Sequence, residues 1–63
     1  MNNLAELVAR SINRAYANGY DLLDSFSDED IAQDMLMYDE TFEGESLMLM
    51  IQAIAHVREN NKK

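Results

Sequence analysis

Residues 47–57 read LMLMIQAIAHV, a run of eleven positions without a charged side chain. Five of its apolar side chains recur every three or four residues: Leu47, Met50, Ile51, Ile54 and Val57. This spacing is typical of a helix that packs between two others. Met48 and Leu49 make the first turns apolar nearly all round, which favours central burial or a second contact surface. We therefore expect a central helix over residues 46–59.

A second amphipathic helix is predicted over residues 4–18. Asn3 is suited to be its N-cap, and Gly19 is suited to the left-handed conformation that ends many helices. Apolar side chains recur along one face at helical spacing: Leu4, Leu7, Val8, Ile12, Ala15 and Tyr16. This face is expected to pack on the central helix.

A third helix is predicted over residues 28–38. Ser27 is a good N-cap, and the three carboxylates that follow it complement the helix dipole. Ile31, Met35 and Tyr38 recur at helical spacing and are expected to form the inner stripe of this helix.

Two connections complete the predicted fold. Residues 20–26 are too short for a full helix, but a single turn would lay three side chains on the core: Tyr20, Leu23 and Phe26. Residues 39–46 are acidic and contain Gly44, and they are interpreted as a connection or a frayed helix start. The pattern predicts an all-α fold, a compact three-helix bundle with a short turn near 20–26, in one small domain over residues 1–63.

Charge is distributed unevenly along the chain. The 63 residues carry 12 acidic and 5 basic side chains, so the formal net charge is −7. Ten of the carboxylates lie within residues 15–57, where no Lys or Arg occurs. Such a stretch cannot neutralise itself through local ion pairs, and its self-repulsion costs stability at low salt. The stretch is expected either to keep the protein soluble or to bind a cationic surface.

The sequence lacks the residues that several chemical functions require. Cysteine is absent, which excludes thiolate zinc sites and cysteine nucleophiles. EF-hand windows that start at Asp28 or Asp39 lack essential ligands, and Met50 replaces the closing Glu of the second window. His56 is the single histidine, without a second histidine for a metal pair. We expect no enzyme activity, no catalytic residue, no metal and no cofactor.

Nucleic-acid binding and membrane insertion are also disfavoured. The helix over residues 46–59 would read DNA in a helix-turn-helix, but residues 46–57 carry no Lys or Arg, and phosphates would repel the acidic stretch. The longest apolar run, residues 47–51, is far shorter than the roughly 20 residues that span a bilayer. No signal peptide is indicated. We expect a cytoplasmic protein that binds neither nucleic acid directly nor membrane.

The acidic stretch fits the opposite role, that of occupying a basic groove that normally holds DNA or RNA. Carboxylates four residues apart on a helix are separated by about 5–6 Å, comparable with phosphate spacing along a strand. Met37 lies on the same polar face and is an adaptable apolar contact. The expected partner-binding residues are Asp21, Asp24, Asp28, Glu29, Asp30, Asp34, Met37, Asp39, Glu40, Glu43 and Glu45.

A short chain without cysteine or proline, with acidic stretches such as residues 27–31 (SDEDI) and 39–43 (DETFE), resembles small phage-encoded inhibitors. These include anti-CRISPR proteins and DNA mimics. The resemblance concerns overall character, so it assigns no residue a role. It implies inhibition of a larger nucleic-acid-handling protein, in the host cytoplasm if the chain is phage-encoded. The alternative is a structural or oligomerisation module that forms a homodimer through its apolar helix over residues 46–59.

Overall fold

The computed structural model describes residues 3–61, which form helices and turns without a strand. In chain order the helices are α1 (Asn3–Ala17), α2 (Leu22–Ser25), α3 (Asp28–Tyr38), the 3₁₀ helix η1 (Glu40–Phe42) and α4 (Leu47–Asn60). The all-α prediction is confirmed, and the three long helices begin and end within one residue of their predicted bounds. The single-turn α2 (Leu22–Ser25) lies at the predicted turn near 20–26, whereas η1 is an addition to the predicted bundle.

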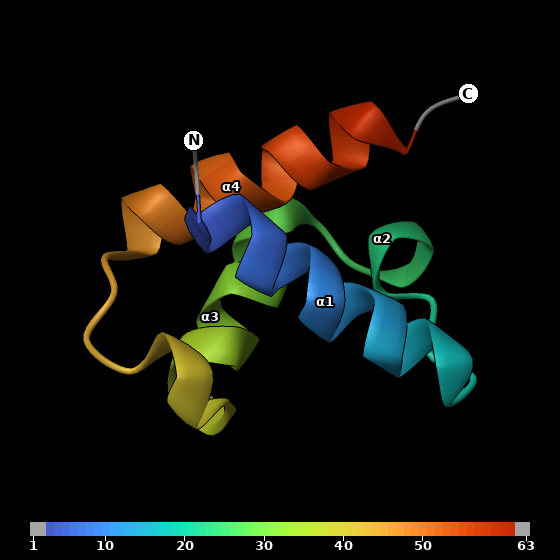
Figure 1. Ribbon diagram of the computed structural model, residues 1–63, viewed down its shortest axis with the longest axis horizontal. Helices are drawn as coiled ribbons and strands as arrows, with labels where there is room; N and C mark the ends of the chain where they lie inside the picture. Colours follow the sequence, from blue (N-terminus) through green and yellow to red (C-terminus); the bar gives the residue numbers. More distant parts are fainter. Residues whose placement is uncertain (1–2, 62–63) are drawn as a thin grey trace.

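Helix α4 is the central element, because it packs against both α1 and α3. Figure 1 shows α4, in orange and red, lying across the blue α1 and the green α3. Met50 and Ile54 are fully buried, as their spacing predicts. Leu47 was expected in the same stripe but is 38% exposed, because the first turn of α4 lies at the end of the bundle, past the start of α1 (Figure 1).

Serine side chains begin two of the long helices. Ser27 Oγ accepts a hydrogen bond from the backbone N–H of Asp30 at 3.2 Å, which caps α3 as predicted. Ser46 Oγ accepts one from the N–H of Leu49 at 3.3 Å and caps α4. At the start of α1 the prediction is wrong, because Asn3 lies within the helix and is not its N-cap.

Helix α1 ends at a left-handed glycine, as predicted. Gly19 has a φ of 95°. Its N–H donates to the carbonyl of Tyr16 at 3.0 Å, and the N–H of Tyr20 donates to the carbonyl of Ala15 at 2.9 Å. This pair of hydrogen bonds is the Schellman motif, which satisfies carbonyls that the helix leaves without partners.

Phe42 is the largest fully buried side chain, although the sequence placed it in a connection. Asp39 ends α3 and caps η1, whose single turn brings Phe42 back to the core. The interpretation of residues 39–46 as a connection or a frayed helix start therefore missed the buried side chain that η1 supplies. The burial of Phe42 was not predicted because its neighbours are acidic and because a turn of three residues shows no periodicity.

Four aromatic side chains predicted to face the core are exposed instead: Tyr16, Tyr20, Phe26 and Tyr38. Leu22 and Leu23 pack on the core from α2, so the residues that flank this short helix turn outward. Tyr16 lies in the last turn of α1, and Tyr38 is the last residue of α3, where the neighbouring helices no longer cover them. Phe42 is thus the one aromatic residue buried among residues 3–61.

Candidate protein-binding surface

The ten predicted carboxylates follow α2, α3, η1 and the loop before α4, along the part of the chain coloured from teal to yellow in Figure 1. Asp28 and Asp39 are half-buried, and the other eight are exposed. Within residues 3–61, no three Asp, Glu or His side chains lie close enough together to hold a metal ion. The carboxylates form an extended acidic surface.

Two of these carboxylates cap short helices. Asp21 accepts a hydrogen bond from the N–H of Asp24 at 3.2 Å and so begins α2. Asp39 accepts from the N–H of Thr41 at 3.0 Å through Oδ1 and from the hydroxyl of Ser11 at 3.3 Å through Oδ2. Because local backbone and side-chain groups satisfy them, the fold accounts for both residues without a partner protein.

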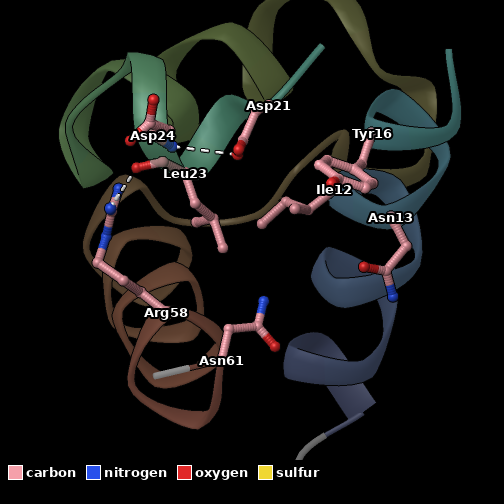
Figure 2. A pocket seen from close by; sticks show the side chains of 8 residues that line it. All are labelled: Ile12, Asn13, Tyr16, Asp21, Leu23, Asp24, Arg58 and Asn61. Carbon is pink, nitrogen blue, oxygen red and sulfur yellow. Dashed lines mark hydrogen bonds between the residues drawn. The ribbon is translucent and has the colours of Figure 1, made fainter. Parts of the chain in front are cut away.

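Asp28 is bound by a distant cation. Arg58 Nε, on α4, lies 2.8 Å from Asp28 Oδ1. The same guanidinium donates to the carbonyl of Leu23, shown by a dashed line in Figure 2, and to that of Phe26 at 2.9 Å. The acidic stretch over residues 15–57 contains no Lys or Arg, but the fold places Arg58 of α4 beside Asp28. Asp28 therefore has a structural role, because its carboxylate is bonded to this arginine.

Seven carboxylates remain whose side chains make no hydrogen bond or ion pair with any described residue: Asp24, Glu29, Asp30, Asp34, Glu40, Glu43 and Glu45. All seven are exposed. No described cation is bonded to them, so they give the elements that carry them a negative potential that attracts cationic groups.

Asp30 and Asp34 border a hollow of about 380 Å³ between α2 and α3. Leu22, Phe26 and Ile31 supply its apolar lining. Ile31 is buried and Leu22 is half-buried, whereas the Phe26 side chain is 51% exposed and forms a wall open to solvent. This α2–α3 hollow combines an apolar interior with two uncompensated charges.

A second acidic and apolar region lies at the end of α3. Met37 is exposed, as its place on the polar face predicts. It borders a shallow hollow of about 410 Å³ together with Tyr38, Glu40 and Glu43. Flexible methionine and aromatic side chains are enriched where proteins contact one another, so this region suits a protein partner.

A third hollow, of about 470 Å³, lies between α1, α2 and the end of α4 (Figure 2). Ile12 and Leu23 point into it, while the amides of Asn13 and Asn61 approach it from opposite helices. Its one cation, Arg58, is already bonded to neighbouring carbonyls and to a carboxylate. No Ser or His side chain lines it, so it offers polar contacts without a nucleophile or a general base of those types.

Three exposed aromatic residues that line these hollows were not among the predicted binding residues, because the sequence assigned them to the core: Tyr20, Phe26 and Tyr38. Tyr20 and Tyr38 line a further hollow, of about 630 Å³, that also includes Asp34. A signal for Tyr38 was present, because it follows Asp34 by four residues and therefore lies on the acidic side of α3. Exposed aromatic residues often carry much of the binding energy at interfaces.

The outer face of α4 carries a separate apolar patch. Met48 is 67% exposed and Leu49 is 50% exposed, at the start of the uncharged residues 47–57. His56 lies on an exposed part of the same helix, with its Nε2 atom 3.1 Å from Asn60 Nδ2. The acidic surface and this patch are thus built from different elements.

The described residues therefore offer an acidic surface with apolar hollows and exposed aromatic side chains. None of the helices over residues 3–61 is both long and apolar enough to cross a bilayer. Comparison of the chain with protein-family models, curated proteins and solved structures finds no match in any of the three.

Proposed function

We propose that this chain is a protein-binding inhibitor without catalytic activity, which occupies a basic, nucleic-acid-binding surface of a larger partner. The supporting observation is the set of seven exposed carboxylates without a bonded partner over residues 24–45. Opposite charges steer association and fix the orientation of two proteins. Phosphates are repelled by the same charges, so the chain competes with nucleic acid rather than binding it.

The class of partner follows from this competition and from the resemblance to anti-CRISPR proteins and DNA mimics. A nucleic-acid-handling protein presents the required basic groove. If the chain is phage-encoded, this partner belongs to the host and the inhibition takes place in the host cytoplasm.

Partner capture from a bacterial lysate tests the function. The immobilised chain should retain a protein at low salt. Salt at about 1 M, where the Debye length is about 3 Å, should release that protein because exposed charges are then screened. Double-stranded DNA or single-stranded RNA should also displace the captured protein. A captured protein that neither salt nor nucleic acid displaces would contradict the proposed mode of inhibition.

Two double variants that each remove two negative charges give a matched comparison. Asp30→Asn with Asp34→Asn alters the acidic surface, whereas Glu6→Gln with Glu59→Gln alters carboxylates outside it. Exposed ion pairs contribute about 0.2–1 kcal/mol each, so the first variant should bind the partner about 2- to 30-fold more weakly. The second should bind nearly as tightly as the unaltered chain. Asp28 is left intact because Arg58 holds it.

The second candidate function is a structural module that dimerises through α4, and the exposed Met48 and Leu49 favour it. An apolar interface of this kind would give a melting temperature that rises with protein concentration. Replacement of Met48 by Lys should abolish that dependence, and added salt should not. A monomer at all concentrations, measured by sedimentation, would eliminate this candidate.

A further inference from the structure

The α2–α3 hollow has two chemically different parts. Its interior is apolar, from Leu22, Phe26 and the buried Ile31, and its border carries Asp30 and Asp34. Neither carboxylate has a bonded side-chain partner among residues 3–61. Because they are four residues apart on α3, both lie on the same side of the helix. A ligand that fills this hollow must be apolar along its length and cationic at its end.

Two amino-acid side chains have this character, and arginine fits better than lysine. Both bury an aliphatic stem against apolar surface while the charged head stays at the edge. The guanidinium is planar and stacks on an aromatic ring such as Phe26. It also donates several hydrogen bonds in a fixed geometry, which suits carboxylates better than a single ammonium does.

The protein itself shows the same recognition on the neighbouring part of α3. Asp28 is bound by the guanidinium of Arg58, which comes from α4. Asp30 and Asp34 lie further along the helix, where no cation of residues 3–61 forms an ion pair with them, although Arg14 borders another hollow together with Asp34. Both carboxylates are therefore open to a cation of another molecule.

We infer that the α2–α3 hollow binds an arginine side chain of the partner protein, with the stem against Leu22, Phe26 and Ile31 and the guanidinium at Asp30 and Asp34. This inference rests on the proposed function and names the group on the partner that anchors the complex. It makes Phe26 a contact residue with a defined role, that of the aromatic wall on which the guanidinium stacks.

Three capped peptides that differ only at the central residue test the hollow on the unaltered chain. They carry arginine, citrulline, which has the same length without the charge, or 2-amino-3-guanidinopropionate, which has the charge on a shorter stem. Methyl NMR signals of Leu22 and Ile31 report binding. The arginine peptide should bind at least about fivefold more tightly than either analogue, since loss of about 1 kcal/mol corresponds to that factor. Equal binding of citrulline, or of the short cation, would overturn the inference.

Matched double variants separate the hollow from general attraction between opposite charges. Asp30→Asn with Asp34→Asn should weaken binding of the arginine peptide about fivefold or more, whereas Glu43→Gln with Glu45→Gln removes the same charge and should change it less than about twofold. Phe26→Ala alters an exposed side chain and should also weaken binding. Equal losses in the two double variants would show attraction by net charge alone and would refute the hollow.

The peptide experiment and partner capture distinguish this inference from the proposed function. If the arginine peptide binds in the hollow but Asp30→Asn with Asp34→Asn does not weaken binding of the captured partner, the arginine site is supported and the proposed partner-binding surface is wrong. If these substitutions weaken binding of the partner but the three peptides bind with equal affinity, the proposed partner-binding surface is supported and the arginine site is wrong.

Discussion

Arg58 Nε donates a hydrogen bond to Asp28 Oδ1 at 2.8 Å and so joins the end of α4 to the start of α3. The same guanidinium donates to the carbonyls of Leu23 and Phe26 at the end of α2. An anion near a helix N-terminus and a cation near a C-terminus are both favourable. A single side chain therefore connects three helices and takes one carboxylate out of the acidic surface.

Arg58→Met keeps much of the stem and removes all three polar contacts, so it should lower the free energy of unfolding by about 1–3 kcal/mol. The stability of Arg58→Lys should lie between those of Arg58→Met and the unaltered chain, because one ammonium cannot reach the three acceptors that the guanidinium spans. Urea unfolding followed by circular dichroism measures both. If Arg58→Met unfolds at the same urea concentration as the unaltered chain, the contacts in this region do not contribute to stability.

Truncation of the two phenylalanines should lower stability to very different extents. Phe42 is fully buried, so Phe42→Ala should cost about 3–5 kcal/mol. A domain of this size rarely holds more than about 3–5 kcal/mol in total, and the variant should be largely unfolded at 25 °C. Phe26→Ala removes a half-exposed ring and should cost less than about 1 kcal/mol. The dispersion of amide NMR signals distinguishes folded from unfolded chain. A folded Phe42→Ala variant would show that η1 is dispensable for the core.

The long helices could be predicted because their causes are local. The Ser27 cap, the left-handed Gly19 and the spacing of apolar residues all act within a few positions of the helices they define. The central place of α4 was also predictable, because its apolar residues recur at the spacing typical of a helix that packs between two others.

Burial at the helix ends could not be predicted, because it depends on how far neighbouring helices extend. Tyr38 continues the spacing of Ile31 and Met35, yet α3 ends there and the ring is exposed. For the same reason composition correctly indicated an acidic surface but not which carboxylates the fold uses. Asp28 depends on Arg58, which lies thirty residues away in the sequence.

Ile54 is fully buried on α4, the helix that contacts both α1 and α3. Ile54→Ala should therefore cost about 2–5 kcal/mol, from lost transfer energy and the cavity left behind, and should leave the chain largely unfolded. The exposed Asn13 of α1 gives the control, and Asn13→Ala should change stability by less than about 0.5 kcal/mol. Thermal melts followed by circular dichroism decide this. Similar melting of both variants would mean that α4 packs through a different face.

Gly19 is required for its conformation rather than for its small size. Its φ is +95°, and an added Cβ would meet no atom within 4 Å, so a substitution introduces backbone strain without a clash. Gly19→Ala should cost about 1 kcal/mol, which lowers the melting temperature by about 4–8 °C in a domain of this size. Gly19→Asn should cost less, because asparagine tolerates the left-handed region better, and Gly19→Val should cost most, because a branched Cβ does not. The exposed neighbour Asn18 serves as control, with Asn18→Ala melting within about 3 °C of the unaltered chain. An alanine variant that melts as high as the unaltered chain would show that α1 ends without need of the Schellman motif.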